Sequence, residues 1–199
     1  MIRNEAKNSK FLDDLKTIEK QTRNCKKIVE ALLHFARKPN IQKSIVNINA
    51  IISDVIQVTR HHLELDHIKI KTKFAQHIPF VKGDAENLKQ VFMNLIINAG
   101  QSITNNGSII ISTAFTGDNI MVKVEDTGSG IEPDVINKIF DPFFSTKPTG
   151  EGTGLGLSIS YGIIKEHNGN ITVKSRPGKG SVFIVELPAV PMSVQKRME

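Results

Sequence analysis

Acidic and glycine-rich turns mark two places in the chain where chemistry on a bulky ligand is possible. The first is DTGSG at residues 126–130, which follows an apolar strand-like run, and the second is GEGTGLGLS at residues 150–158. A carboxylate at a strand end can accept a hydrogen bond from the exocyclic amine of a base, and glycines let a ligand approach the backbone closely. Between the two clusters lie a short helical pattern and a loop with Pro142, Ser145 and Lys147. This arrangement suggests a lid over a phosphate-bearing ligand.

Neither cluster is specific on its own, because DxGxG also makes a plain turn. The second cluster lacks the Gly-Lys-Ser/Thr ending of a Walker loop. It also does not follow a strand with a later acidic residue, as a dinucleotide-binding fold requires. It does precede a helical pattern at about 156–167, and the N–H groups at a helix N-terminus can hold phosphates.

A helix predicted over about 85–104 carries the other candidate residues. Gln90, Asn94 and Asn98 lie four apart on a face separate from the apolar one. Asparagine is a poor helix former, so its repeated use here invites a functional explanation. An amide oxygen is a hard, neutral ligand suited to Mg²⁺, which keeps waters and phosphates as its other ligands. From the helix alone, an ordinary polar stripe explains these residues equally well.

The elements that must position these residues can be read from hydrophobic periodicity and turn residues. Helices are predicted at about 50–64, 85–104 and 156–167, and strands at 44–49, 68–74, 108–115, 119–125, 170–176 and 181–187. Asn49 is the predicted cap of the first helix. The runs TGD at 116–118 and PGKG at 177–180 predict β-hairpins. The expected fold is therefore α+β, a two-layer α/β sandwich whose mixed, mostly antiparallel sheet has helices on one face.

A long helix is predicted over residues 7–37, since no Gly or Pro occurs before Lys38. Its apolar residues follow the alternating spacing of a coiled-coil seam, which a single helix cannot bury alone. We expect a second copy of this helix and further helices as partners, and a helix folded back on its own domain is the alternative. Pro39 ends the helix. The predicted units are a helical dimerisation segment at 1–39, a catalytic domain at 40–188 and a tail at 189–199.

Composition excludes several classes of protein. The 199 residues are 39% hydrophobic and include one cysteine, Cys25, so no internal disulfide is possible and a reducing compartment is expected. No apolar run approaches a membrane span, which predicts a cytoplasmic protein or the cytoplasmic part of a membrane-anchored one. The net charge of +6 comes from lysines scattered among acids, with one Tyr and no Trp. We therefore expect no nucleic-acid partner.

Taken together, the motifs resemble the catalytic domain of sensor histidine kinases, within the wider superfamily of Bergerat-fold ATPases. The similarity runs from about residue 80 to 188 in the family's order. The similar runs are NLIINA at 94–99 (N box), DTGSGI at 126–131 (G1 box), FDPFFSTK at 140–147 (F box) and GTGLGLS at 152–158 (G2 box). Four motifs in order are specific where each alone is weak.

The resemblance implies ATP and Mg²⁺ as cofactors and a role for each matching residue. Asn98 would be the metal ligand, Asp126 would bind the adenine amine, and Asn94 and Lys147 would act near the γ-phosphate as catalytic residues. Residues 141–153 would form the ATP lid. The ATP-binding residues implied are Asn94, Asn98, Asp126, Gly128, Gly130, Ile131, Phe140, Thr146, Lys147, Gly152, Thr153, Gly154, Leu155, Gly156 and Leu157.

The resemblance further implies transfer of the γ-phosphoryl group to a histidine, for relay to the receiver domain of a response regulator. The family's acceptor histidine lies on a helix that precedes 7–37, and none of the six histidines has its sequence context. The chain is therefore expected to bind nucleotide without phosphorylating itself, and to form a homodimer through 7–37. Gln101 stands where many relatives carry a basic residue, so phosphate affinity is expected to depend more on Mg²⁺ and the lid.

Two other activities fit the same superfamily. One is a nucleotide-gated conformational module, as in chaperone, mismatch-repair or topoisomerase ATPases. The other is a serine kinase of the anti-sigma type. The FDPFFSTK run and the short spacing between the glycine boxes argue against the first, and the helical segment at 7–37 argues against the second.

Overall fold

The computed structural model describes residues 11–12, 14–15, 17–19, 21–22, 43–104, 106–147 and 152–191. The described residues between 11 and 22 are helical, as the seam pattern predicts. The remainder of the helix predicted at 7–37, including His34, lies outside the described residues.

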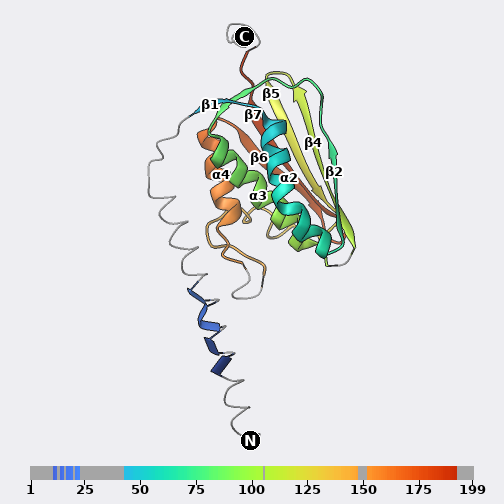
Figure 1. Cartoon of the computed structure of the whole chain (residues 1–199), viewed down its shortest axis with the longest axis vertical. Helices are drawn as coiled ribbons and strands as arrows, with labels where there is room; N and C mark the ends of the chain where they lie inside the picture. The colour runs from blue at the N-terminus through green and yellow to red at the C-terminus, as the bar shows by residue number, and fades with distance from the viewer. Residues whose placement is uncertain are drawn as a thin grey trace, which may run out of the picture.

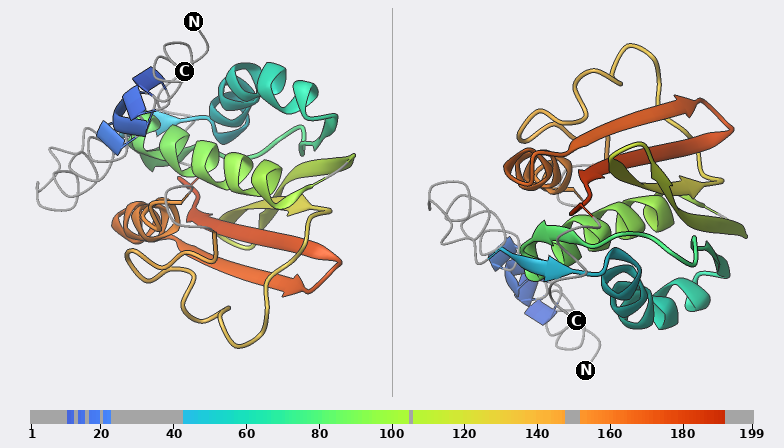
Figure 2. Two further views of the ribbon diagram at one scale, coloured as in Figure 1. Left: turned by 90° about the horizontal axis from the view of Figure 1, so that it is seen from below. Right: turned by 90° about the horizontal axis from the view of Figure 1, so that it is seen from above.

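The described residues from 43 to 191 form a five-stranded sheet covered on one face by a layer of three helices, as Figures 1 and 2 show. The helices are α2 (Ile48–Leu65), α3 (Ala85–Ser102) and α4 (Gly156–Glu166). The strands are β1 (Ser44–Val46), β2 (Ile68–Lys73), β3 (Val81–Gly83), β4 (Gly107–Thr116), β5 (Asn119–Asp126), β6 (Asn170–Arg176) and β7 (Gly180–Pro188).

The sheet has the order β2-β4-β5-β7-β6, with β1 and β3 forming a separate two-stranded sheet. Only β2 and β4 pair in parallel within the five strands, and every other pair is antiparallel. The predicted α+β sandwich with a mixed, mostly antiparallel sheet is confirmed. Both predicted hairpins are present, because β4–β5 and β6–β7 turn at the glycine-containing runs.

Alternation along the central strands directs one set of side chains toward the helices. Ile109 and Ile111 of β4 and Val122 of β5 are completely buried, while the residues between them are more exposed. On the helical side, Phe92 and Leu95 of α3 are completely buried. Helix α3 packs against both α2 and α4, so it lies in the middle of its layer (Figure 1). Side chains on α3 can therefore meet the sheet and both neighbouring helices.

The start of α2 differs from the prediction. The cap is Asn47, whose Oδ1 accepts from the Ala50 amide at 3.2 Å, and the strand before it is shorter than expected. Asn49 instead lies within the helix and joins it to the sheet. Its Nδ2 donates to the Ala75 carbonyl at 3.0 Å, and its Oδ1 accepts from the Thr113 hydroxyl at 2.9 Å.

The short helical pattern expected after the first glycine cluster forms a series of turns. Its amides bond to carbonyls three residues earlier, as from Val135 to Glu132 at 3.2 Å and from Lys138 to Val135 at 2.8 Å. At the other end, Ala189 and Val190 fall in the predicted tail. Their amides donate to the carbonyls of Asp118 and Phe80 at 2.9 and 2.8 Å, which attaches them to the domain.

Candidate functional site

Asp126 ends β5 and its side chain is the most heavily hydrogen-bonded group of the site. It is 3% exposed, and a single oxygen, Oδ1, receives three donors. These are the Gly128 amide at 2.8 Å, the Ser102 hydroxyl at 3.0 Å and the Ser181 amide at 3.2 Å. Burial raises the pKa of this carboxyl above its ordinary value, while the three donors act in the opposite direction. None of the described residues donates to the second oxygen, Oδ2.

The loop that follows Asp126 is held between the end of α3 and the β6–β7 hairpin. A Cβ on Gly128 would lie 2.0 Å from the Ser102 hydroxyl oxygen, so no larger residue fits there without displacing α3. Gly130 lies against the backbone of Arg176. The Ile131 amide donates to the Ser175 hydroxyl at 2.8 Å. These contacts fix the backbone of the predicted G1 residues beside Asp126.

The two asparagines of α3 have different environments. The Asn94 Nδ2 donates to the Gly156 carbonyl at 3.1 Å and to the Ser160 hydroxyl at 3.3 Å, which connects α3 to the first turn of α4. Asn98, one turn later, is partly buried, and its side-chain amide makes no hydrogen bond to any described residue. An amide oxygen without a protein partner fits a metal ligand better than a structural role. No group of three or more His, Cys, Asp or Glu side chains in the described residues could hold a metal ion by itself.

The second glycine cluster leads into α4, whose first turn lacks a side-chain cap. Backbone N–H groups at such a helix start have no partner within the helix and suit an anion. Leu155 is buried beneath this turn, and its amide lies 3.4 Å from the Thr153 hydroxyl. Gly156 and Leu157 occupy the first turn itself, next to Asn94. The predicted G2 residues are therefore brought beside the predicted N-box residue.

The loop between the clusters folds back on itself where it is described. Gly154 has a φ of +66°, and a Cβ there would lie 2.4 Å from the Phe143 carbonyl carbon, so this position requires glycine. A Cβ on Gly152 would lie 2.6 Å from the Ser145 hydroxyl oxygen. Phe140 packs on the core and its ring centroid lies 5.6 Å from that of Tyr161. The two ends of the predicted lid are thus adjacent.

Lys147 connects this loop to α3. Its ammonium group donates to the Gln101 side-chain oxygen, and its amide donates to the Ser145 hydroxyl at 3.2 Å. Gln101 lies three residues after Asn98, on the neighbouring part of the same helix face. The Lys147 cation is therefore held about one helical turn from the candidate metal ligand. Thr146 is exposed to solvent beside it.

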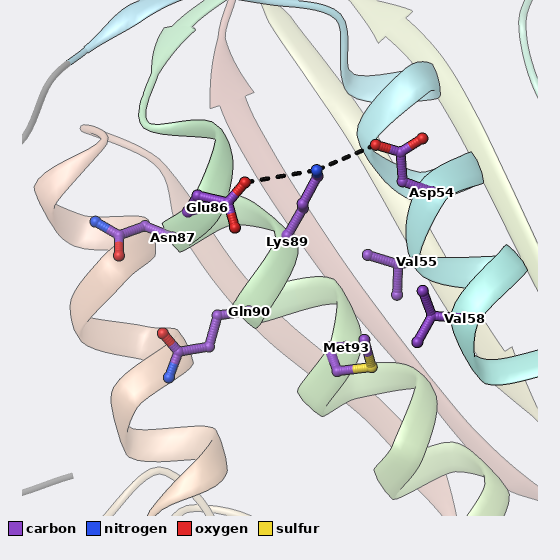
Figure 3. A pocket seen from close by; sticks show the side chains of 8 residues that line it. All are labelled: Asp54, Val55, Val58, Glu86, Asn87, Lys89, Gln90 and Met93. Atoms are coloured by element: carbon purple, nitrogen blue, oxygen red, sulfur yellow. Dashed lines mark ion pairs between the residues drawn. The ribbon is translucent and has the colours of Figure 1, made fainter. Parts of the chain in front are cut away.

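A groove of about 510 Å³ between α2 and α3 lies apart from these motifs. Lys89 of α3 lies between Asp54 and Glu86 (Figure 3). Its Nζ is 3.1 Å from the Asp54 Oδ2 and 3.5 Å from the Glu86 Oε1. The hydrogen bond to Asp54 and the charge of Glu86 raise the pKa of Lys89. Gln90 lines this groove, so the polar stripe predicted on α3 is divided between two locations. No residue of the glycine clusters lines the groove.

Two functional contacts were missed by the sequence reasoning. Ser102 and Ser181 both donate to Asp126, and they lie 24 and 55 residues from it in the chain. Their only local signal is that each lies next to a predicted element boundary. Such a signal does not distinguish a carboxylate partner from an ordinary surface serine.

Comparison with known proteins agrees with this geometry. Residues 83–191 match the family described as "Histidine kinase-, DNA gyrase B-, and HSP90-like ATPase". The catalytic domain of histidine kinase ThkA in a nucleotide-free form is 34% identical, with a TM-score of 0.68 over 76% of this chain and 98% of that one. The chain therefore belongs to this ATPase family, in its histidine kinase catalytic-domain branch.

Longer relatives give the same class. Signal transduction histidine-protein kinase AtoS of Escherichia coli (strain K12) is 33% identical over 196 residues, which are 98% of this chain and 32% of AtoS. A structure of ThkA in complex with the response regulator protein TrrA is 30% identical, with a TM-score of 0.74 over 88% of this chain and 50% of that one. The chain thus spans about a third of the length of its first curated relative. Within the described residues, no helix is long and apolar enough to span a bilayer.

Proposed function

We propose that this chain is the ATP-binding catalytic module of a sensor histidine kinase. In this role it binds Mg-ATP and transfers the γ-phosphoryl group to a histidine, for relay to an aspartate of a response regulator. The observation that carries the proposal is the hydrogen bonding of Asp126. Its Oδ1 is fully occupied by protein donors, so its Oδ2 has a fixed direction and accepts from the 6-amino group of adenine.

The rest of the nucleotide would follow the C-terminal half of α3. Asn98 would hold Mg²⁺ through its amide oxygen, together with phosphate oxygens and waters. The metal supplies neutralisation of the charge on the phosphates when it is bound. Lys147, positioned by Gln101, adds a cation from the lid. The uncapped first turn of α4 offers its N–H groups to the phosphates.

The chemistry asked of the protein is mainly positioning. Phosphoryl transfer requires alignment of the attacking nitrogen, the phosphorus and the leaving oxygen, and stabilisation of the equatorial oxygens. The Asn94 Nδ2 is committed to Gly156 and Ser160, so this residue acts by fixing α4 against α3. Its Oδ1 is the atom available on the γ-phosphate side.

The likeness to ThkA in complex with the response regulator protein TrrA supports a receiver domain as the partner. Dimerisation through residues 7–37 is part of the proposal. Phe11, Leu15 and Ile18 are helical and 63%, 45% and 61% exposed, which leaves apolar surface for a second copy. Light scattering of the chain and of Leu15→Asp tests this, since a monomeric parent chain contradicts it.

The activity is tested with γ-labelled ATP and a separately supplied phosphoacceptor domain from a related kinase. We expect single-turnover transfer that gives acid-labile label on histidine, and loss of transfer in Asn98→Ala. Steady multiple-turnover hydrolysis without transfer would instead indicate a nucleotide-gated conformational module. Acid-stable label on serine would indicate a serine kinase.

A further inference from the structure

Ser102 ends α3 beside Asp126, and its hydroxyl faces two acceptors. The oxygen lies 2.8 Å from the Ala99 carbonyl and 3.0 Å from the Asp126 Oδ1. A hydroxyl has one proton, so it donates fully to only one of them at a time. A carboxylate is the stronger acceptor, whereas a neutral carboxyl is not. Which of the two acceptors receives the Ser102 proton therefore depends on whether Asp126 is ionised.

The three donors on Oδ1 also determine where a proton on Asp126 would sit. Oδ1 has no lone pair left after the Gly128, Ser102 and Ser181 bonds, so the proton must be on Oδ2. Oδ2 is also the only oxygen able to accept from an adenine amine. Protonation would turn this acceptor into a donor that faces the donor of the base. The base site thus requires ionised Asp126.

The groups that stabilise the ionised form of the Asp126 carboxyl are neutral. The donors to it come from α3, β7 and the following loop and are Ser102, Ser181 and Gly128, and the β4 residue paired with Asp126 is the apolar Ile109. The last turn of α3 contains no basic residue. Glu125, on the same strand, is the charged residue whose field acts on Asp126, and it favours the neutral form. Hydrogen bonds alone therefore oppose the effect of burial.

We propose that Ser102 is a positioning residue for base recognition, whose hydroxyl keeps Asp126 ionised and its Oδ2 directed at the adenine amine. Of the three donors it is the only side chain, so it can be removed without changing the backbone. This inference rests on the proposed function only for its nucleotide measurement. It predicts a pH dependence that a merely structural serine would not produce.

The first measurement is made without nucleotide. The Asp126 carboxyl of the whole chain is titrated by ¹³C NMR in the parent, Ser102→Ala and Ser102→Thr. Loss of a charge-assisted hydrogen bond should raise the titration midpoint by about one pH unit in Ser102→Ala. Ser102→Thr, which keeps the hydroxyl, should titrate like the parent. The matched control is Ser53→Ala. The Ser53 hydroxyl donates to the Asn49 carbonyl of the same helix at 2.8 Å, as the Ser102 hydroxyl does to the Ala99 carbonyl, but it lies away from the site.

The second measurement is ATP affinity against pH by calorimetry. In Ser102→Ala the pH at which half of the affinity is lost should rise by the same amount as the NMR midpoint, with little loss at high pH. An unmoved Asp126 midpoint, or an equal affinity loss at every pH, would overturn the inference. If the parent chain binds no ATP at any pH, the proposed function fails, and the NMR titration still decides the role of Ser102.

Discussion

Replacing Asp126 by asparagine changes one atom of the proposed base site and keeps its shape. In Asp126→Asn the amide oxygen can take the place of Oδ1 and accept from the same three donors. The amide nitrogen then takes the place of Oδ2, where it is a donor. An adenine amine would face this donor, while the 6-oxo group of inosine triphosphate would be a suitable acceptor. Asp126→Asn should therefore weaken ATP binding and favour inosine triphosphate.

The size of the effect follows from the bond that is lost. A hydrogen bond to a charged group contributes about 1.5–3 kcal/mol, so ATP affinity should fall by about 10- to 150-fold. Affinity for inosine triphosphate should rise or stay the same, which reverses the preference. Calorimetry with both nucleotides measures this directly. Equal affinities of parent and variant for ATP, or an equal loss for both nucleotides, would refute the assignment of Oδ2 to the base.

Stability supplies the control. Burial raises the pKa of Asp126 in the folded protein, so the folded state binds the proton more tightly than the unfolded state. The stability associated with this group is present below its ordinary pKa and is lost as pH rises through the raised value. Asparagine carries no such cost, so Asp126→Asn should unfold in urea at the same or a higher concentration at neutral pH. A marked loss of stability would mean that weaker binding reflects misfolding.

Three further predictions test other parts of the molecule. Asn98→Ala should reduce the gain in ATP affinity on adding Mg²⁺ by about tenfold or more and leave metal-free ATP binding unchanged. Asn94→Ala should weaken ATP binding with and without the metal. Calorimetry with and without chelator measures both variants. Lys147→Gln should weaken ATP binding about fivefold but leave adenosine binding unchanged. Adding Gln101→Lys should restore the ATP affinity, because the cation then comes from the other member of the bonded pair. An unrestored ATP affinity in this double variant would contradict the idea that either position can supply the cation. His167→Ala should lower the free energy of unfolding in urea by about 2–4 kcal/mol, with partial recovery in His167→Gln, and an unchanged midpoint would contradict its bonding role.

The last prediction depends on a contact at the start of α3. His167 is 3% exposed, its Nδ1 lies 2.7 Å from the Ile163 carbonyl, and its Nε2 accepts from the Asp84 amide at 2.9 Å. Since the Asp84 backbone N–H can only donate, the proton of the neutral ring is on Nδ1. This ring thus joins the end of α4 to the first turn of α3. Glutamine can present an acceptor to the Asp84 amide, which is why partial recovery is expected.

Elements with strong local signals can be predicted from the sequence. The predicted start of α3 is the observed one, because Asp84 caps the helix, and the regular apolar spacing places its predicted end within two residues of the observed one. The hairpins follow from glycine-containing turns. The prediction of Asn49 as the cap of α2 is wrong, because Asn47 lies two residues earlier and can cap equally well. The choice is made by Ile48, which is completely buried in the first turn, and by Thr113, whose hydroxyl donates to Asn49 from the sheet.

Contacts between distant segments set the limit of such reasoning. The parallel pairing of β2 with β4 could not be predicted from a local turn, because the two strands are not consecutive in the chain. The sequence indicates Gln101 and Lys147 separately, yet their bond joins residues 46 apart. The motif resemblance points to Asp126 but not to Ser102. Family motifs identify the residues that face the ligand, whereas the residues that orient them become visible only when the elements are assembled.

Helix α3 explains why the separate motifs can act on one ligand. Its first turn is joined to α4 through His167, and its middle is joined to α4 again through Asn94. In the proposed function its last turns carry both Asn98, the metal ligand, and Ser102, the partner of Asp126, four residues or about 6 Å apart along the axis. The spacing between the proposed metal ligand and the residue that positions Asp126 is therefore set by one helix and not by loop conformation. Substitutions of single side chains on α3 should consequently affect base, metal or lid independently, whereas a helix-breaking residue within it should affect all three together.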